Sequence, residues 1–512
     1  MEEDDRPLKL SMNPVSDRIN NRVKCGNYQL ITFLVATTML FCDGQEMLIM
    51  TVVNIRLKTL WKLSPASEGT LGMCVFAGVL VGSVVSGAMA DKYGRKITIM
   101  SFLAILCVAG LGSALAPSLV WLVIIRAVAG IGLGGTLPAS TTYIAELTPD
   151  NVRALVMLLL FGFGFPLGEC LTALQSLWLD PNVGNNWRWL LALSSLPAFF
   201  SFVLVGLFFD ETPQYLYANG RRQEAEEILL KMERSNKSPL CCCCCGIRSW
   251  SRSRRGEGEE AEEGTDGEEG TERTEDGTTD SDPLLPKSLM DEDTFNGSAD
   301  QSSSDRSFSA LLKELFNVAR PIDTYMVWTI YIIVSLIFYG LVWIFPMTLK
   351  DGGGTEDNNG IAVKLLYSAL AEVPSALFPI LLIDWLGRKG TMVASFVLCI
   401  PLACACALLA PQLRGSAESV GFLWAVMGLK CMINGAFNVI YIYAVEYVPS
   451  RVRGFAVGMG SGASRIGGIA TPYLMVVAHR THLANPYWIF VGLSVVGLIA
   501  TLVLKEVDRQ MR

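Results

Sequence analysis

Histidine is almost absent from this sequence of 512 residues, in which only His479 and His482 occur, close together in one predicted loop. No nucleotide-binding P-loop, paired metal-binding motif or nucleophile elbow is present either. The sequence therefore gives no support to ATP hydrolysis within this chain, and we expect no enzymatic activity, no metal and no cofactor. For the two histidines, a position in a solvated loop is favoured over a role in pH sensing.

Charged residues are also scarce: they make up 17% of the sequence, whereas 51% of the residues are apolar. The apolar residues gather in runs near 29–54, 67–90, 97–115, 119–143, 154–177, 188–209, 325–349, 362–384, 391–411, 421–445, 455–478 and 485–504. Each run is close to the roughly 20 residues that a helix needs to cross about 30 Å of hydrocarbon. A soluble protein would need twelve buried helices of unusual length. The sequence therefore predicts an all-α membrane protein with twelve transmembrane helices.

Two short phrases occur twice, once in each half of the sequence. GAMADKYGRK at 87–96 is partly repeated by DWLGRK at 384–389, and its aspartate recurs after 293 residues. A glutamate followed by an arginine seven positions later occurs at 146–153 and again at 446–453, an offset of 300 residues. Two signatures duplicated at nearly equal offset indicate one six-helix unit copied in tandem. The twelve helices are therefore expected to form two six-helix bundles.

The repeat and the apolar runs divide the chain into five predicted parts. Lys and Arg are more frequent in the short segments on the side that holds both termini, which predicts that both termini are cytoplasmic. Residues 257–282 hold thirteen acids and one arginine, a charge of −12, so the rest of the chain is +5 and the net charge of −7 says nothing about the substrate. The parts are a cytoplasmic N-terminus (1–28), an N-terminal bundle (29–209), a largely disordered cytoplasmic linker (210–324), a C-terminal bundle (325–504) and a cytoplasmic C-terminus (505–512).

The linker carries two candidate signals. Most cysteines outside it lie within apolar runs, which is not the pattern of a disulfide framework. Its five consecutive cysteines lie beside a basic cluster, which suits palmitoylation together with attraction to anionic lipid; unmodified low complexity is the alternative. The phrase DSDPLL has the form of an acidic dileucine signal, so we expect a sorting adaptor as partner and a vesicle, endolysosomal or plasma membrane as location. The residues are Cys241, Cys242, Cys243, Cys244 and Cys245 for lipidation, and Asp280, Leu284 and Leu285 for sorting.

Seven ionisable residues lie well inside the apolar runs, where a charge costs about 2.5–3.5 kcal/mol and needs a partner or water. Four acids and three bases nearly neutralise one another if they face one central polar cavity. Asp43 and Glu46 are three residues apart on one helix face, and two carboxylates so close together cannot both ionise cheaply. A static salt bridge that only fixes helix packing is the alternative. The residues expected to couple transport to protons are Asp43, Glu46, Glu169 and Arg126.

The second half carries the other three of these residues, Glu372, Lys430 and Arg465. Lys430 lies sixteen residues before the repeated glutamate, whereas Arg126 lies twenty residues before its counterpart. Both halves are therefore expected to place charged side chains at the membrane midplane, where transporters bind their substrate. We expect Lys430, Arg465 and Glu372 to bind the substrate.

The duplicated phrases are expected to latch one half against the other at the cytoplasmic helix ends in the outward-facing state. Breaking such charge networks should shift conformational populations more than substrate affinity. Topology signals alone explain a lone arginine but not a duplicated Gly-Arg-Lys spacing. The latch residues are Gly87, Asp91, Gly94, Arg95, Lys96, Glu146 and Arg153 in the first half and Asp384, Gly387, Arg388, Glu446 and Arg453 in the second.

These motifs resemble the major facilitator superfamily, whose loop 2–3 signature is similar to GAMADKYGRK and whose fourth-helix signature is similar to RAVAGIGLGG. CDGQEMLIMTVV, TYIAELTPDNVRA, LAEVP, YAVEYVPSRVRG and ASRIGGIATPYL are similar to the synaptic-vesicle-two-related transporter-like proteins of that superfamily. The resemblance covers both halves and leaves out only the linker. It implies two six-helix bundles around a central cavity that work by alternating access.

Neighbouring families fit less well. Sugar porters carry a Pro-Glu-Ser-Pro-Arg phrase after the sixth helix, from which DETPQ at 210–214 departs at the arginine. Organic cation and anion transporters carry a long outer loop with cysteines after the first helix, where this sequence has only 55–66 and no cysteine. Proton-coupled aromatic-acid symporters are similar around the Asp-Gly of the first helix, which supports a proton role for Asp43.

Three functions follow from this pattern. The leading hypothesis is a monomeric, proton-coupled secondary transporter of a small organic ion, with the lipid bilayer, protons and the ion as partners and no nucleic acid. A uniporter for a sugar-like solute is the second, although seven buried charges suit a sugar site poorly. A vesicle-membrane receptor or trafficking protein, with the linker as its working part, is the third.

Overall fold

The computed structural model describes residues 14–23, 25–179, 186–237, 308–318, 320–352, 358–414, 420–448 and 450–506. The chain divides into two compact units, of which one combines Met1–Leu240 with Phe316–Arg512 and the other is Cys241–Leu315. The short helix α11 (Phe308–Val318) begins in the second unit. The predicted signals of the linker, Cys241 to Cys245 together with Asp280, Leu284 and Leu285, lie outside the described residues.

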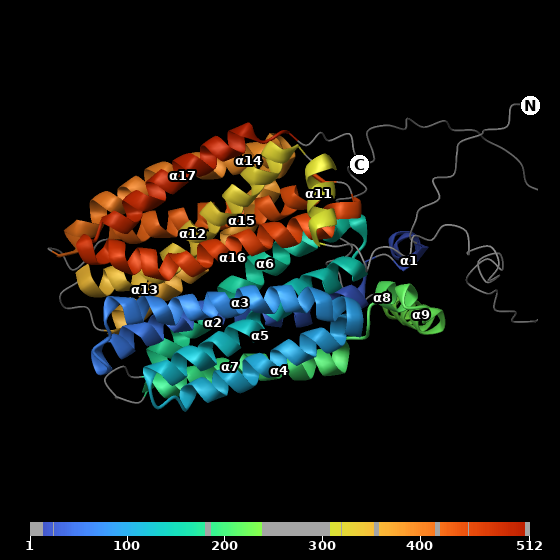
Figure 1. Cartoon of the computed structure of the whole chain (residues 1–512), viewed down its shortest axis with the longest axis horizontal. Helices are drawn as coiled ribbons and strands as arrows, with labels where there is room; N and C mark the ends of the chain where they lie inside the picture. The colour runs from blue at the N-terminus through green and yellow to red at the C-terminus, as the bar shows by residue number, and fades with distance from the viewer. Residues whose placement is uncertain are drawn as a thin grey trace, which may run out of the picture. The chain divides into compact units, whose positions relative to one another are not determined.

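The first unit contains two groups of long helices, which Figure 1 shows as a blue-to-green group and a yellow-to-red group. The first group is α2 (Asn27–Leu60), α3 (Pro65–Tyr93), α4 (Arg95–Ala114), α5 (Leu119–Leu147), α6 (Asp150–Trp178) and α7 (Asn186–Phe208). The second is α12 (Pro321–Gly352), α13 (Asn358–Leu370), α14 (Val373–Leu409), α15 (Val420–Glu446), α16 (Ser450–Thr481) and α17 (Asn485–Val503), with a short 3-10 turn η4 (Ala410–Arg414). These groups are the two halves of the protein.

The helix ends follow from local sequence. Ser64 caps α3, because its hydroxyl accepts a hydrogen bond from the backbone N–H of Ser67 at 3.2 Å, and Pro65 opens the helix. Ser118 caps α5 in the same way. Between α3 and α4 the chain turns at Gly94, whose φ of 97° is a conformation that favours glycine.

Eleven helices in the described part of the chain are long and apolar enough to cross a membrane. The predicted all-α membrane fold is therefore confirmed, with one difference at the eleventh apolar run. That run forms α16, a helix of 32 residues whose glycines, serines and Arg465 make it less apolar than the others. The eighth run is broken into α13 and the start of α14, and the ninth run is the rest of α14, beyond Gly387.

The surface of this unit is apolar, whereas charge is buried. Trp178 and Trp385 are 82% and 86% exposed, while Arg126 and Glu169 are fully buried. A soluble protein shows the opposite arrangement, and lipid is the solvent that explains it. The chain is therefore an integral, multi-pass membrane protein.

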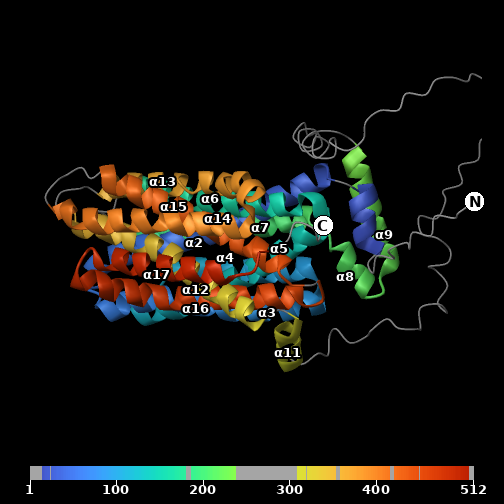
Figure 2. The same ribbon diagram turned by 90° about the horizontal axis from the view of Figure 1, so that it is seen from above.

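The two ends of the helix bundle differ, and we name them by their elements. The linker end is where α2 and α12 begin and α7 and α17 end; the other is the far end. At the linker end, α1 (Pro14–Arg18) and the π-helical turn η1 (Ile19–Val23) lie beside α9 (Arg222–Lys237), which follows α8 (Pro213–Ala218) (Figure 2). Arg18 pairs with Glu233 at 3.2 Å, and Asn236 accepts a hydrogen bond from the N–H of Tyr28 at 3.0 Å.

Glycines let α3 and α5 approach closely. A methyl group placed on Gly130 would overlap the backbone carbonyl of Val75, and one placed on Gly78 would overlap that of Ala127. Small residues that allow such contact are the usual basis of helix packing in membranes, because lipid leaves no hydrophobic force between helices.

Gly130→Ala is therefore expected to destabilise the protein by about 1–3 kcal/mol, as for an overpacked core. Gly492→Ala is the matched control, because Gly492 lies on the exposed side of α17 with nothing within 4 Å of the added carbon. Thermal unfolding of the purified protein, followed by tryptophan fluorescence, measures both. Equal unfolding temperatures for the two variants would contradict the close approach of α3 and α5.

Candidate functional site

The two halves meet along three sets of helices: α3 packs against α16, α2 against α12, and α6 against α13 and α14. Six of the seven ionisable residues predicted inside the membrane lie on these helices and on α5 and α15, and the seventh, Glu372, lies in the break between α13 and α14. The structure buries all of them. The exposed fraction is 6% for Asp43, 3% for Glu46, 0% for Arg126, Glu169 and Glu372, and 3% for Lys430 and Arg465.

Lys430 stands at the centre of a three-residue cluster that joins the two halves. Its ammonium lies 2.5 Å from Glu169 Oε2 and 2.5 Å from Glu372 Oε1. Glu169 belongs to α6 of the first half, whereas Lys430 on α15 and Glu372 belong to the second. One ammonium is thus shared by two carboxylates from opposite sides of the interface. We call Glu169, Glu372 and Lys430 the bridging triad.

A break in the eighth membrane helix positions Glu372. Pro374 lacks an N–H and its ring disfavours a continuous helix at this point, so the chain leaves the helix at 371–372 and begins again at Val373. Ser375 secures the break by donating to the carbonyl of Glu372 at 2.5 Å, and Asn434 on α15 donates to Ser375 at 2.8 Å. Broken helices at this depth are typical of binding sites in transporters.

Arg126 and Glu46 form a second pair, entirely within the first half. Arg126 Nη1 on α5 lies 2.5 Å from Glu46 Oε2 on α2. The Nε and Nη2 atoms of Arg126 are buried and have no hydrogen-bond partner in the described part of the chain. The guanidinium therefore has donors left for a further polar group.

Asp43 faces the second half. It interacts electrostatically with Arg465 on α16, although the described residues show no direct ion pair between them. Arg465 Nη1 instead donates a hydrogen bond to the hydroxyl of Tyr339 on α12 at 3.0 Å. The structure thus brings Asp43, Glu46, Arg126 and Arg465 into one group, with two acids and two bases, and places Glu169 in the bridging triad.

Aromatic rings from three helices pack against one another, and one of them, Phe338, also contacts Tyr339, the hydrogen-bond partner of Arg465, at 5.4 Å between ring centroids. Phe338 on α12 lies 5.9 Å from Phe437 on α15 and 5.5 Å from Phe165 on α6, measured between ring centroids. Tyr441 on α15 contacts Phe161 on α6 at 5.6 Å and Tyr331 on α12 at 5.1 Å. The site therefore combines buried charge with aromatic surface from both halves.

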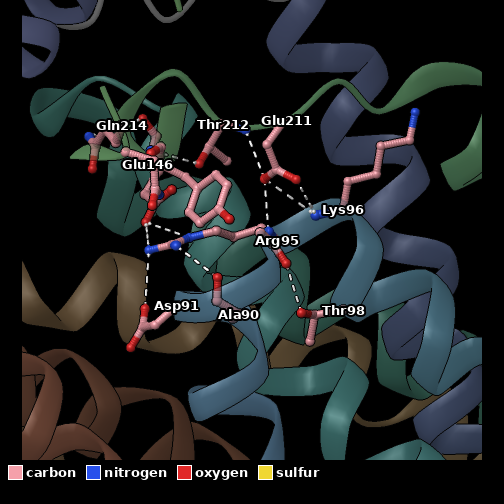
Figure 3. Close-up of polar contacts among 12 residues, drawn as sticks. Ala90, Asp91, Arg95, Lys96, Thr98, Glu146, Glu211, Thr212 and Gln214 are labelled. Carbon is pink, nitrogen blue, oxygen red and sulfur yellow. Dashed lines mark hydrogen bonds and ion pairs between the residues drawn. The ribbon is translucent and has the colours of Figure 1, made fainter. Parts of the chain in front are cut away.

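The first of the two duplicated phrases forms a network at the linker end, drawn in Figure 3. Arg95 Nη2 pairs with Glu146 Oε1 at 3.0 Å and with Asp91 Oδ1 at 3.6 Å, and Arg95 Nη1 donates to the carbonyl of Ala90. Glu211, which the sequence analysis did not single out, accepts hydrogen bonds from the backbone N–H groups of Arg95 and Lys96 at 2.8 and 3.2 Å. These contacts of Arg95 all lie within the first half.

Several repeated residues have the same geometry in both halves. Gly387 has a φ of 72°, as Gly94 has 97°. The Lys96 ammonium donates to the carbonyl of Gly206 in the last turn of α7, and the Lys389 ammonium donates to that of Leu502 in the last turn of α17. The turn at the glycine and the contact of the lysine are therefore repeated in the second half.

The remaining latch residues are placed as follows. Arg153 Nη2 donates to the carbonyl of Thr148 at 3.0 Å, and Gly87 has open space around it. Arg388 is half-buried just beyond Gly387. The side chains of Asp384, Glu446 and Arg453 lie outside the described part of the structure.

Tyr143 and Tyr443 form a further pair that the sequence analysis missed. Each is buried, and each donates its hydroxyl at 2.7 Å to a backbone carbonyl just after the last helix of its half, at Asp210 and Lys505. Their separation of 300 residues equals that of the repeated glutamates, which is the signal that could have identified them.

The far end holds two further ion pairs that join the halves. Arg480 on α16 pairs with Glu68 on α3 at 2.8 Å, and Lys58 on α2 lies 3.6 Å from Asp351 on α12. His479 is 6% exposed and lies 3.1 Å from Asp351, so the prediction of a solvated loop is wrong for this residue, because α16 extends past it. The prediction holds for His482, which is exposed.

Breaking the Glu68–Arg480 pair is expected to loosen the far end. Arg480 is partly exposed, so Glu68→Gln should cost about 1 kcal/mol and speed amide exchange in the far-end segments of α3 and α16 about fivefold. Glu224→Gln is the control, because the Arg221–Glu224 pair is exposed and lies within one half. Hydrogen–deuterium exchange with mass spectrometry measures both variants. Unchanged exchange in Glu68→Gln would show that this pair does not hold the end closed.

A model of the Major Facilitator Superfamily matches residues 34–472, and the chain belongs to this family. The relatives include organic cation/carnitine transporter 7 of Arabidopsis thaliana, 30% identical over 89% of this chain and 87% of that protein. The niacin transporter NiaP of Acinetobacter baylyi is 27% identical over 82% of this chain and 81% of that protein. The synaptic vesicle 2-related protein of Xenopus laevis is 24% identical over 90% of this chain and 75% of that protein. The protein is a membrane transporter, not an enzyme.

Solved structures support the fold. The xylose transporter XylE from E. coli, in a partially occluded inward open conformation, matches with a TM-score of 0.64 and 17% identity, covering 93% of this chain and 98% of that one. At this identity the likeness establishes the shared fold of two six-helix halves.

Proposed function

We propose that this transporter carries a small organic ion across the membrane by alternating access, coupled to protons as a symporter. The observation that carries the proposal is the bridging triad, in which buried charges from both halves meet at a broken helix. Charges in this position change their partners when the halves move, which is what coupling an ion gradient to a conformational cycle requires.

The composition of the site favours an organic ion over a sugar. Four carboxylates and three cations are buried in the two halves, and aromatic rings of α6, α12 and α15 pack against one another across the interface. An aromatic surface binds the apolar part of an organic ion and can also attract a cation to its ring face. Two relatives are named for such ions, carnitine and niacin.

The roles follow from the positions. Asp43, Glu46 and Glu169 accept or sense the proton, and Arg126 competes with it for the carboxylates. Lys430 and Arg465, with Glu372, hold the charged group of the substrate. The networks of Arg95 and of the far-end pair Glu68–Arg480 bias the populations of the two access states.

The orientation and the membrane are part of the proposal. The excess of Lys and Arg beside the linker end favours a cytoplasmic location for both termini. The linker signals favour vesicle or endolysosomal membranes, with a sorting adaptor as partner. Protease protection of a tag on each terminus in intact cells tests the orientation.

A counterflow assay at equal pH tests the substrate class. Purified full-length protein in liposomes loaded with unlabelled nicotinate, carnitine or xylose is presented with a trace of the same solute in labelled form. Accumulation of label in vesicles loaded with an organic ion, but not with xylose, supports the proposal. Exchange with xylose alone favours a sugar uniporter, and no exchange with any of them counts against transport of these classes.

A further inference from the structure

The seven buried ionisable residues form two groups, and only one of these groups contains equal numbers of acids and bases. Asp43, Glu46, Arg126 and Arg465 contain two acids and two bases, so their charge cancels. The bridging triad contains two carboxylates and one ammonium, and a net charge of −1 remains when both carboxylates are ionised. An uncompensated charge at this depth costs several kcal/mol, so the triad is poorly stable in that state.

In the described part of the chain, Lys430 is the one cation that forms an ion pair with either carboxylate of the triad. The neighbours that face it are Cys170 on α6 and Cys431 on α15, which are thiols, and Ser375, which is bonded to backbone and to Asn434. Glu169 Oε1 and Glu372 Oε2 are buried without hydrogen-bond partners there. An oxygen with no donor beside it is poorly suited to hold negative charge.

We infer that the bridging triad holds one proton, shared between Glu169 and Glu372, and that this proton is the one that couples transport. One carboxylate takes H⁺ from water and becomes a carboxylic acid, Lys430 stays an ammonium, and the charge of the triad changes from −1 to 0. This inference rests on the proposed function for its role in coupling, and it moves the proton from α2 to the interface between the halves.

The placement of the three residues explains how movement of the halves could release the proton. While the halves are in contact, two carboxylates compete for one ammonium, so a proton must be bound. When the halves separate at this point, Lys430 and Glu372 remain together in the second half as a neutral pair. Glu169 then leaves with α6, and its carboxyl group can ionise into water. Proton binding and the conformation are thereby linked.

Infrared difference spectroscopy of the purified, membrane-reconstituted protein at pH 7 tests this directly, because it detects the C=O stretch of carboxylic acids and needs no substrate. Exposed carboxylates are ionised at this pH. The wild type is compared with Glu169→Gln and Glu372→Gln, which each leave one carboxylate for one ammonium. Both variants should lose the band of one carboxylic acid. Lys430→Met should show about twice the wild-type band, since both remaining carboxyl groups then need a proton.

Glu46→Gln is the matched control, because Glu46 is also a buried glutamate paired with one cation. Its band should equal that of the wild type. A band that survives either glutamine substitution in the triad overturns the inference. A band lost in Glu46→Gln instead places the proton on α2, which refutes the triad while leaving proton-coupled transport intact. If the triad band is present but the rate of transport does not depend on an imposed pH gradient, the proposed function is refuted, whereas the shared proton is not.

Discussion

Replacing Lys430 with methionine is expected to reduce proton-driven uptake of the transported ion by at least about 100-fold. The substitution keeps the length of the side chain but removes the ammonium that holds Glu169 and Glu372 at 2.5 Å each. Without the ammonium both carboxyl groups keep their protons in either conformation, so proton binding is no longer linked to the movement of the halves; the loss of a coupling free energy of about 3 kcal/mol corresponds to about a 100-fold change. Uptake into proteoliposomes, normalised to the amount of folded protein, measures the effect.

Lys231→Met is the control for this experiment. Lys231 pairs with Asp210 at 2.6 Å, but it is 60% exposed at the linker end and lies within the first half. Its loss should change uptake less than about twofold, because an exposed pair contributes little. If Lys430→Met retains uptake within the same factor, the triad does not take part in transport.

Arg126→Leu is expected to lower the stability of the folded protein by about 3–5 kcal/mol, because it leaves the carboxylate of Glu46 buried without a cation. Unfolding of the purified protein in denaturant or on heating measures this loss. A comparable loss of transport is expected, since Asp43 and Arg465 adjoin the pair.

The double variant Arg126→Leu/Glu46→Leu separates structure from function. Replacing both partners by apolar groups removes the unpaired charge, so most of the stability should return. Transport should not return, because the free donors of Arg126 are absent. Recovery of transport together with stability would show that the pair only fixes helix packing, which was the alternative interpretation of these residues.

The membrane fold and the repeat could be predicted from the sequence, because both are visible as patterns along the chain and do not depend on which residues contact one another. Apolar runs of membrane-spanning length determine the helices, and both duplicated phrases turn at a glycine with positive φ, Gly94 and Gly387. The eleventh run shows the limit of this approach: α16 spans 32 residues, yet its polarity is explained only by its packing against α3 and α12.

The partners of the charged residues could not be predicted, because partner choice depends on helix rotation and on contacts between segments distant in sequence. Glu169 and Lys430 are separated by 261 positions, and nothing in the spacing indicates that they meet. The role of Glu211 could not be predicted for the same reason. It accepts hydrogen bonds from the backbone N–H groups of Arg95 and Lys96, and Lys96 lies 115 positions away in the sequence. Tyr143 and Tyr443, in contrast, share the offset of the repeat and were within reach of the sequence.

The most direct test of the account is uptake of labelled nicotinate or carnitine, whichever exchanges in counterflow, into proteoliposomes with an imposed inward proton gradient. The account predicts accumulation above the external concentration in the wild type, and its collapse when a protonophore is added. Accumulation should also be lost in Glu169→Gln. Uptake that stops at equal concentrations, and that is the same with and without the gradient, would contradict proton-driven transport through the two halves.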